Sequence, residues 1–183
     1  MRLFHTLSAV GAVAAMLAAA MPAQAGQQAP LNIKFSQNSR GGVCYVGFEG
    51  GNAPGTDKPM TLEFSYRVRD GNFGATVKVN GWPKAQAEAA KGDEKPIPMT
   101  LKFDTGKTTT SRSGGWESGF DDDAWGGWGA GPTSDAAFPM LKDAKTASVK
   151  FDGLDFGSFN LQMKSLAHVS LEDCAKRVKE GKE

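Results

Sequence analysis

The chain has 183 residues, and its 21 Lys and Arg nearly balance 20 Asp and Glu, which leaves a formal net charge of +1 at pH 7. This balance, without a cluster of basic residues, excludes the broad positive surface of a nucleic-acid-binding protein and a polybasic attachment to anionic membranes. A chain of this length is expected to form one domain with a sizeable core.

The first 25 residues have the features of a secretory signal peptide. Arg2 supplies a positive start, Leu7–Ala20 is a short run of small and apolar residues, and Ala23-Gln24-Ala25 is a small-x-small cleavage site. We therefore expect a periplasmic or secreted protein whose mature domain spans 26–183, with no membrane span after cleavage. An uncleaved N-terminal membrane anchor is the alternative.

Alternation of apolar and polar residues, typical of half-buried strands, recurs along the mature chain. The expected strands lie at 31–36, 43–48, 60–68, 74–80, 99–104, 147–151 and 156–163. Val43–Phe48 is apolar on both faces apart from Gly47 and should be central, while Asp70-Gly71-Asn72 and Asp152-Gly153 supply the turns of two hairpins. The pattern predicts a mainly β fold, rich in antiparallel sheet and arranged as one sheet or as a sandwich.

A few short helices are expected between and after the strands, at 84–91, 134–145 and 170–180. Pro139 should kink the second helix or delay its start. In the third, Ser170 is the expected N-cap, and one apolar face is formed by Leu171, Cys174, Ala175 and Val178.

Cys44 and Cys174 are the only cysteines, and in an exported protein such a pair favours a single disulfide. The bond would dock the C-terminal helix onto the first strands, and closing so long a loop stabilises the fold by roughly 4 to 5 kcal/mol on the chain-entropy model. A reactive thiol pair is the alternative, but the spacing is not C-x-x-C.

The segment Ser113–Pro132 departs from the pattern, because it combines many glycines with three of the four tryptophans and several carboxylates. Its period fits neither a helix nor a regular strand, so the sequence predicts a long loop that is packed down or used in recognition. The candidate ligand-binding residues in it are Trp116, Glu117, Phe120, Asp121, Asp122, Asp123, Trp125 and Trp128.

Three interpretations of this segment stay open. The rings can fold inward as a small satellite core, or they can stay exposed beside carboxylates as a platform for a sugar ring or a partner's side chain. The third is Ca²⁺ binding, although Asp121–Asp123 is contiguous and lacks the alternating spacing of a calcium loop. No other cofactor is indicated.

Few catalytic groups remain once the expected signal peptide is removed. His168 is then the only histidine, and neither a G-x-S-x-G elbow nor a phosphate-binding glycine loop occurs. The surviving enzyme hypothesis is a glycoside hydrolase that pairs Glu117 with Asp121 or Asp123, one of the two having a raised pKa.

The function that the sequence favours is therefore non-catalytic. We expect an accessory or binding protein of the bacterial cell envelope that contacts a protein or a glycan through residues 113–132. The alternatives are the carboxylate-pair glycoside hydrolase and a purely structural envelope protein. The oligomeric state is left open by the sequence.

Overall fold

The computed structural model describes residues 34–38, 42–92, 95–129 and 134–182. The expected signal peptide, 1–25, and the first residues of the strand expected at 31–36 lie outside these ranges. No helix in the described ranges is both long and apolar enough to cross a membrane.

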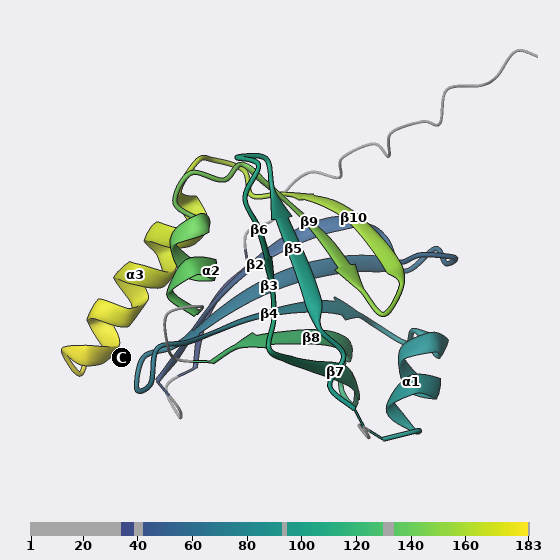
Figure 1. Ribbon diagram of the computed structural model, residues 1–183. Helices are drawn as coiled ribbons and strands as arrows, with labels where there is room; N and C mark the ends of the chain where they lie inside the picture. Colours follow the sequence, from purple (N-terminus) through teal and green to yellow (C-terminus); the bar gives the residue numbers. More distant parts are fainter. Residues whose placement is uncertain (1–33, 39–41, 93–94, 130–133, 183) are drawn as a thin grey trace, which may run out of the picture.

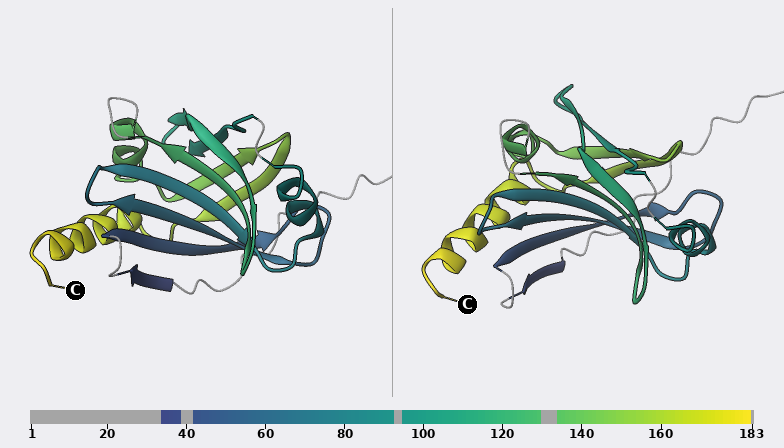
Figure 2. Two further views of the ribbon diagram at one scale, coloured as in Figure 1. Left: turned by 90° about the horizontal axis from the view of Figure 1, so that it is seen from below. Right: turned by 60° about the horizontal axis from the view of Figure 1, so that its bottom comes forward.

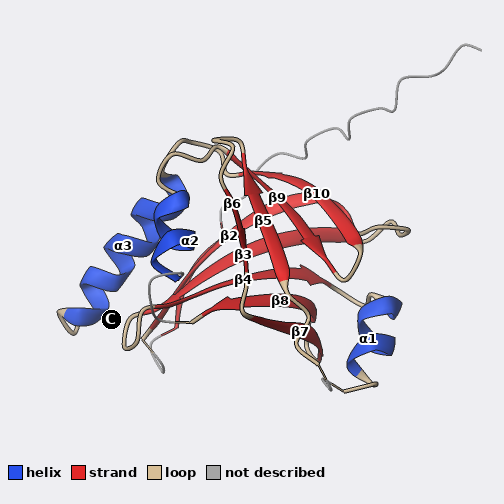
Figure 3. Ribbon diagram, viewed as in Figure 1, coloured by secondary structure: helices blue, strands red, loops and turns tan. Residues whose placement is uncertain are grey.

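Two antiparallel sheets form the body of the protein, which confirms the predicted mainly β fold (Figures 1 and 3). The six-stranded sheet consists, in spatial order, of β1 (Lys34–Asn38), β2 (Val43–Asn52), β3 (Pro59–Arg67), β4 (Asn72–Val79), β8 (Asp122–Trp128) and β7 (Ser113–Ser118). The four-stranded sheet consists of β10 (Leu154–Asn160), β9 (Thr146–Phe151), β5 (Met99–Phe103) and β6 (Thr108–Thr110). Both predicted hairpins, β3–β4 and β9–β10, are present, and β2 has a neighbour on each side as predicted.

The hydrophobic core lies between the two sheets. Along β4, buried Phe73, Ala75, Val77 and Val79 alternate with residues on the opposite face, as a strand with one apolar face requires. Leu101 of β5 and Phe151 of β9 meet them from the second sheet and are almost fully buried. Burial of each large apolar side chain contributes about 1.5 to 3 kcal/mol to folding.

Three helices flank the sheets: α1 (Pro83–Ala89), α2 (Ser134–Met140) and α3 (Leu166–Lys179). Helix α1 lies against β7 and β8, whereas α3 contacts β2 and β3. Pro139 is inside the last turn of α2, which ends one residue later and not near Lys145.

Helix α3 begins earlier than predicted, so the assignment of Ser170 as its N-cap is wrong. The N-cap is Ser165, and Ser170 lies inside the helix. Ala167 and His168 are buried, and the His168 ring stacks on Phe138 at a centroid distance of 4.5 Å. Packing of this extra turn against α2 thus overrides the capping signal.

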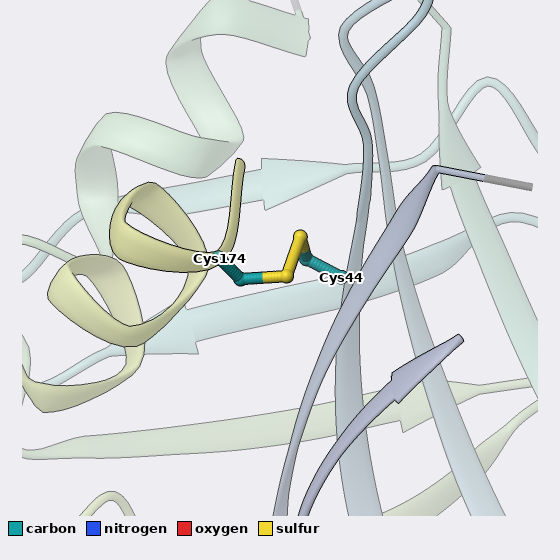
Figure 4. The surroundings of a disulfide bond; sticks show 2 residues. All are labelled: Cys44 and Cys174. Atoms are coloured by element: carbon teal, nitrogen blue, oxygen red, sulfur yellow. A yellow bond between two sulfur atoms is a disulfide. The ribbon is translucent and has the colours of Figure 1, made fainter. Parts of the chain in front are cut away.

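The predicted disulfide between Cys44 on β2 and Cys174 on α3 is confirmed (Figure 4). The two Cα atoms are 5.9 Å apart, the residues are separated by 130 positions in sequence, and both side chains are fully buried. Leu171, Cys174 and Ala175 form the predicted buried face of the helix. The bond therefore fastens the C-terminal helix to the inner side of the six-stranded sheet.

The prediction of a long loop over 113–132 is wrong, because most of this segment forms the β7–β8 hairpin at one edge of the six-stranded sheet. Its glycines conceal the strand period, since they carry no hydrophobic signal. They are needed for space: a Cβ atom at Gly114 would lie 2.2 Å from the carbonyl oxygen of Ile97, and one at Gly126 would lie 2.5 Å from Cβ of Met99. The segment before and within β5 thus runs directly over the hairpin.

Candidate functional site

The outer face of the six-stranded sheet is the side directed away from the core. The four-stranded sheet covers the inner face, and α3 is attached there through Cys44. Figure 2 shows the helices at the two ends of this sheet, with its strands running between them. Among the described residues, the outer face is therefore the broad surface that no helix covers.

Antiparallel pairing places the outward residues of neighbouring strands in rows across this face. The first row consists of Tyr45, Ser65, Gly74, Gly127 and Ser113. The second consists of Gly47, Glu63, Thr76, Trp125 and Gly115. The third consists of Glu49, Thr61, Lys78, Asp123 and Glu117. Apart from Tyr45, the first row has small side chains or none, and apart from Thr61, the side chains of the third row are charged.

A groove with a volume of about 460 Å³ follows the first row, and we call it the outer groove. Its outward-facing lining residues include Tyr45, Ser65, Arg67, Gly74, Thr76, Ser113, Glu117, Trp125 and Gly127. Gly74 and Gly127 are cross-strand partners, and a Cβ atom on them would lie 2.6 Å from Oγ of Ser65 and 2.9 Å from Oγ of Ser113, respectively. The absence of side chains at these two positions gives the groove its depth.

Trp125 is the partly exposed tryptophan that lines this groove. Its side chain is half-buried, and ring atom Cζ3 would lie 3.7 Å from a Cβ atom placed on Gly127. The indole therefore leans from the second row toward the glycine floor of the first. A ring held in this way offers part of one apolar face to a ligand.

The other tryptophans belong to the core. Trp82, Trp116 and Trp128 are only 2%, 5% and 1% exposed, so the interpretation in which rings fold inward holds for Trp116 and Trp128. Nε1 of Trp116 donates a hydrogen bond to Asp152 and Nε1 of Trp128 donates one to Thr109. Their polar atoms have partners within the protein, and although Trp128 borders the outer groove, both side chains are buried in the core.

Phe120 stands apart from both groups. It is 100% exposed in the turn between β7 and β8 and does not line the groove. A single exposed ring is ordinary on a protein surface. It provides a natural control for experiments on Trp125.

The three consecutive aspartates are separated by the alternation of β8. Asp122 points inward, is 3% exposed and accepts hydrogen bonds from the backbone N–H of Trp82 at 2.8 Å, Nε2 of Gln86 at 3.3 Å and Oγ of Ser118 at 2.7 Å. It therefore fixes the start of α1 to the hairpin. Asp123 points to the outer face, and Asp121 lies in the turn before the strand.

A charged cluster surrounds Asp123 at the Trp125 end of the groove. It contains Glu63, Lys78, Glu117, Asp121 and Asp123. Burial raises the pKa of Asp123 to about 6, with further contributions from the negative charges of Asp121, Glu117 and Glu63, while Lys78 acts in the opposite direction. Oδ1 of Asp123 is buried and has no hydrogen-bond donor among the described residues.

Lys78 is the cation of this cluster, and it forms a salt bridge with Glu63. Its Nζ lies 3.0 Å from Oε1 of Glu63. Burial lowers the pKa of Lys78, but the hydrogen bond and the charge of Glu63 outweigh this effect and leave the pKa above its ordinary value. One lysine thus faces four carboxylates.

No group of three or more His, Cys, Asp or Glu side chains in the described part of the chain is arranged to hold a metal ion. His168 is 8% exposed on α3, with Nδ1 3.1 Å from Glu172, and it lies on the inner side of the sheet with Phe138. It takes no part in the outer groove.

The sequence identified Trp125, Glu117 and Asp123, which the structure brings together on one face, but missed the contribution of β2, β3 and β4. Tyr45, Ser65 and Gly74 were hidden because their place depends on which strands are neighbours. The alternation of the strand predicted at 60–68 does mark Ser65 as an outward residue, whereas the strand predicted at 43–48 is apolar on both faces and gives no such signal for Tyr45. No protein-family model, curated protein or solved structure matches the chain.

Proposed function

We propose that this protein is a non-catalytic binding protein that works outside the cytoplasm and takes a glycan chain in the outer groove. The observation that carries the proposal is the half-buried Trp125, which leans over a glycine floor in a polar groove while the other three tryptophans are buried.

Sugars match this surface in two ways. The C–H face of a sugar ring is apolar and can stack on the indole of Trp125, in the way that flat apolar groups pack on aromatic rings. Its hydroxyl groups need donors and acceptors beside the ring, and Ser65, Ser113 and Thr76 provide hydroxyls along the groove. Glu117, exposed at the β7 end, adds a carboxylate acceptor.

The extracytoplasmic location is supported by the disulfide. Bonds of this kind persist in the periplasm and in secreted proteins and are rare in the cytosol. The Cys44–Cys174 bond therefore agrees with the expected signal peptide.

Isothermal titration with a panel of soluble envelope and plant oligosaccharides tests the proposal. We expect at least one linear oligosaccharide to bind, and Trp125→Ala to weaken its binding by about 5- to 30-fold, since stacking on an aromatic ring and burial of its face contribute about 1 to 2 kcal/mol. Trp125→Phe should keep part of the affinity.

Phe120→Ala is the matched control, because it removes an aromatic ring from the same hairpin without touching the groove. Its affinity should equal that of the wild-type protein. Absence of binding to every oligosaccharide would count against the proposal. Capture of a protein partner that depends on Phe120 and not on Trp125 would replace it with protein recognition by the hairpin tip.

A glycoside hydrolase is the second candidate, and one specific observation favours it. Glu117 and Asp123 are direct cross-strand partners, so their Cβ atoms are about 5 Å apart, and the pKa of Asp123 is raised to about 6. Retaining glycosidases use two carboxyl groups about 5 to 5.5 Å apart, one of which stays protonated as the general acid, and cross-strand neighbours are close enough for their carboxyl groups to come within this range. Here Asp123 would be the acid and Glu117 the nucleophile.

Release of reducing ends from the same oligosaccharides separates the two candidates. Turnover that disappears in both Glu117→Gln and Asp123→Asn would establish the hydrolase. Binding without turnover, at pH 5 and at pH 7, would leave the non-catalytic function in place.

A further inference from the structure

The two ends of the outer groove differ in charge. At the Arg67 end, the guanidinium Nη1 lies 3.2 Å from Oδ2 of Asp70, so its charge is balanced within the protein. At the Trp125 end, Lys78 is paired with Glu63, and among the described residues it is the one cation whose charge acts on Asp123. The groove is therefore negative on the side where the indole lies.

This combination selects for a positive group on the ligand. An ammonium beside an indole is attracted by the negative face of the ring, and nearby carboxylates add Coulomb attraction. Asp123, the cross-strand partner of Glu117, adds its charge to this field from the same face, while Glu117 is the carboxylate that lines the groove. A ligand with uronate groups would instead meet repulsion here.

The shape of the groove also restricts the ligand. Its floor row crosses β3, β4, β8 and β7 nearly perpendicular to the strands, a span of about 14 Å at the usual strand spacing. The floor is formed by Ser65, Gly74, Gly127 and Ser113, whose side chains are small or absent. An extended chain can lie flat on this floor.

From charge and shape together, we infer that the outer groove prefers an unbranched glycan whose sugars carry protonated amines, with one sugar stacked on Trp125 and its amine facing Glu117 and Asp123. This inference rests on the proposed glycan-binding function and narrows it to one ligand class, an amino-sugar chain.

Three oligosaccharides with the same β-1,4 backbone provide the test, because they differ only at carbon 2 of each sugar. Glucosamine hexamer carries amines, N-acetylglucosamine hexamer carries neutral acetamides, and cellohexaose carries hydroxyls. At pH 6.5 and low salt, we expect glucosamine hexamer to bind about tenfold more tightly than either neutral chain, because an amine gains both ring and carboxylate attraction. This difference should shrink in 0.5 M NaCl, where exposed charges are screened.

Charge-neutral variants assign the preference to named residues. In the double variant Glu117→Gln, Asp123→Asn, the preference should fall to within about twofold, because loss of the Glu117 acceptor weakens all three chains alike while loss of the negative charge weakens only glucosamine hexamer. Trp125→Ala should weaken all three ligands. Glu49→Gln is the matched control, since it removes a carboxylate from the same face but on β2, three strands away from β8. Circular dichroism and thermal unfolding establish that each variant is folded.

The results of these titrations distinguish the preference for amines from glycan binding in general. If all three hexamers bind equally and depend on Trp125, the amine preference is overturned while glycan binding stands. A preference that survives in the double variant overturns the assignment to Glu117 and Asp123. If none of the hexamers binds but another neutral glycan does, the inference also fails, and if no glycan binds at all, both proposals fail together.

Discussion

The two faces of the β7–β8 hairpin have opposite roles although they are built from the same few residue types. Trp116, Asp122 and Trp128 face inward and are buried, whereas Glu117, Asp123 and Trp125 lie on the outer face, where Glu117 and Trp125 line the outer groove. Neighbouring residues such as Asp122 and Asp123 thus differ completely in environment. Position on the strand, and not composition, decides which tryptophans and carboxylates build the core and which are available to a ligand.

The largest expected effect separates the inward and outward tryptophans. Trp128→Ala should lower the free energy of unfolding by about 4 kcal/mol, because it empties a fully packed site beside Phe73, whose ring centroid is 5.6 Å away. Trp125→Ala should cost less than about 1 kcal/mol. Urea unfolding of both variants measures the difference, and equal losses would place Trp125 in the core.

A smaller effect is expected for the inward aspartate. Asp122→Ala leaves the buried N–H of Trp82 without its acceptor, which should cost about 2 kcal/mol and lower Tm by about 5 °C. Asp121→Ala, in the adjacent turn, is the control and should leave Tm nearly unchanged. A thermal scan in which both variants behave alike would argue against the anchoring role of Asp122.

Replacement of the outward aspartate, Asp123, should change the stability of the protein in the opposite direction. Its folded-state pKa of about 6 lies above the ordinary value of 3.8, so between these pH values the folded protein holds a proton that the unfolded chain has released. The contribution of Asp123 to stability therefore falls as pH rises from about 4 to about 6 and stays low above that range.

Asp123→Asn removes the free-energy cost of ionising this partly buried carboxyl group above pH 6. After allowance for solvent screening at a partly exposed site, we expect a gain of about 1 kcal/mol at pH 7.5 and almost none at pH 3.5. Urea unfolding at the two pH values checks both numbers. A variant that is less stable than the wild-type protein at pH 7.5 would show that Asp123 is satisfied by partners within the protein.

The smallest effect is spectroscopic. Since Trp82, Trp116 and Trp128 are buried, acrylamide should quench one class of tryptophan, and Trp125→Phe should remove that class. A bound oligosaccharide should protect the same fraction. Quenching that persists in Trp125→Phe would mean that one of the inward rings opens to solvent.

Much of the fold could be predicted from the chain, because local signals agree with the final structure. Asp70-Gly71-Asn72 joins two alternating runs, and β3 and β4 form the expected hairpin. Cys174 lies on the apolar face of its helix and reaches Cys44 as expected. The β7–β8 hairpin was not predictable in this way. Gly114 and Gly126 are required there because Ile97 and Met99, from another part of the chain, lie too close for a side chain at these positions.

The candidate site was only partly predictable for a related reason. The right kinds of residue were found in the segment 113–132, but sorting Trp125 from Trp116 and Trp128 requires the strand register. The groove itself requires the pairing of β4 with β8, which brings Gly74 beside Gly127. Such a contact between distant parts of the chain has no local sequence signal.

The disulfide also sets an order of events during biosynthesis. Cys44 is on β2 and Cys174 is on α3, 130 positions later in the sequence, so Cys44 has no partner for this bond until α3 has been synthesised. Every strand of the six-stranded sheet precedes Cys174 in the chain, so the sheet can pair around an unpaired thiol before oxidation attaches α3 to it. A thiol-reactive label that enters at Cys44 would mark unfinished molecules and leave completed ones untouched.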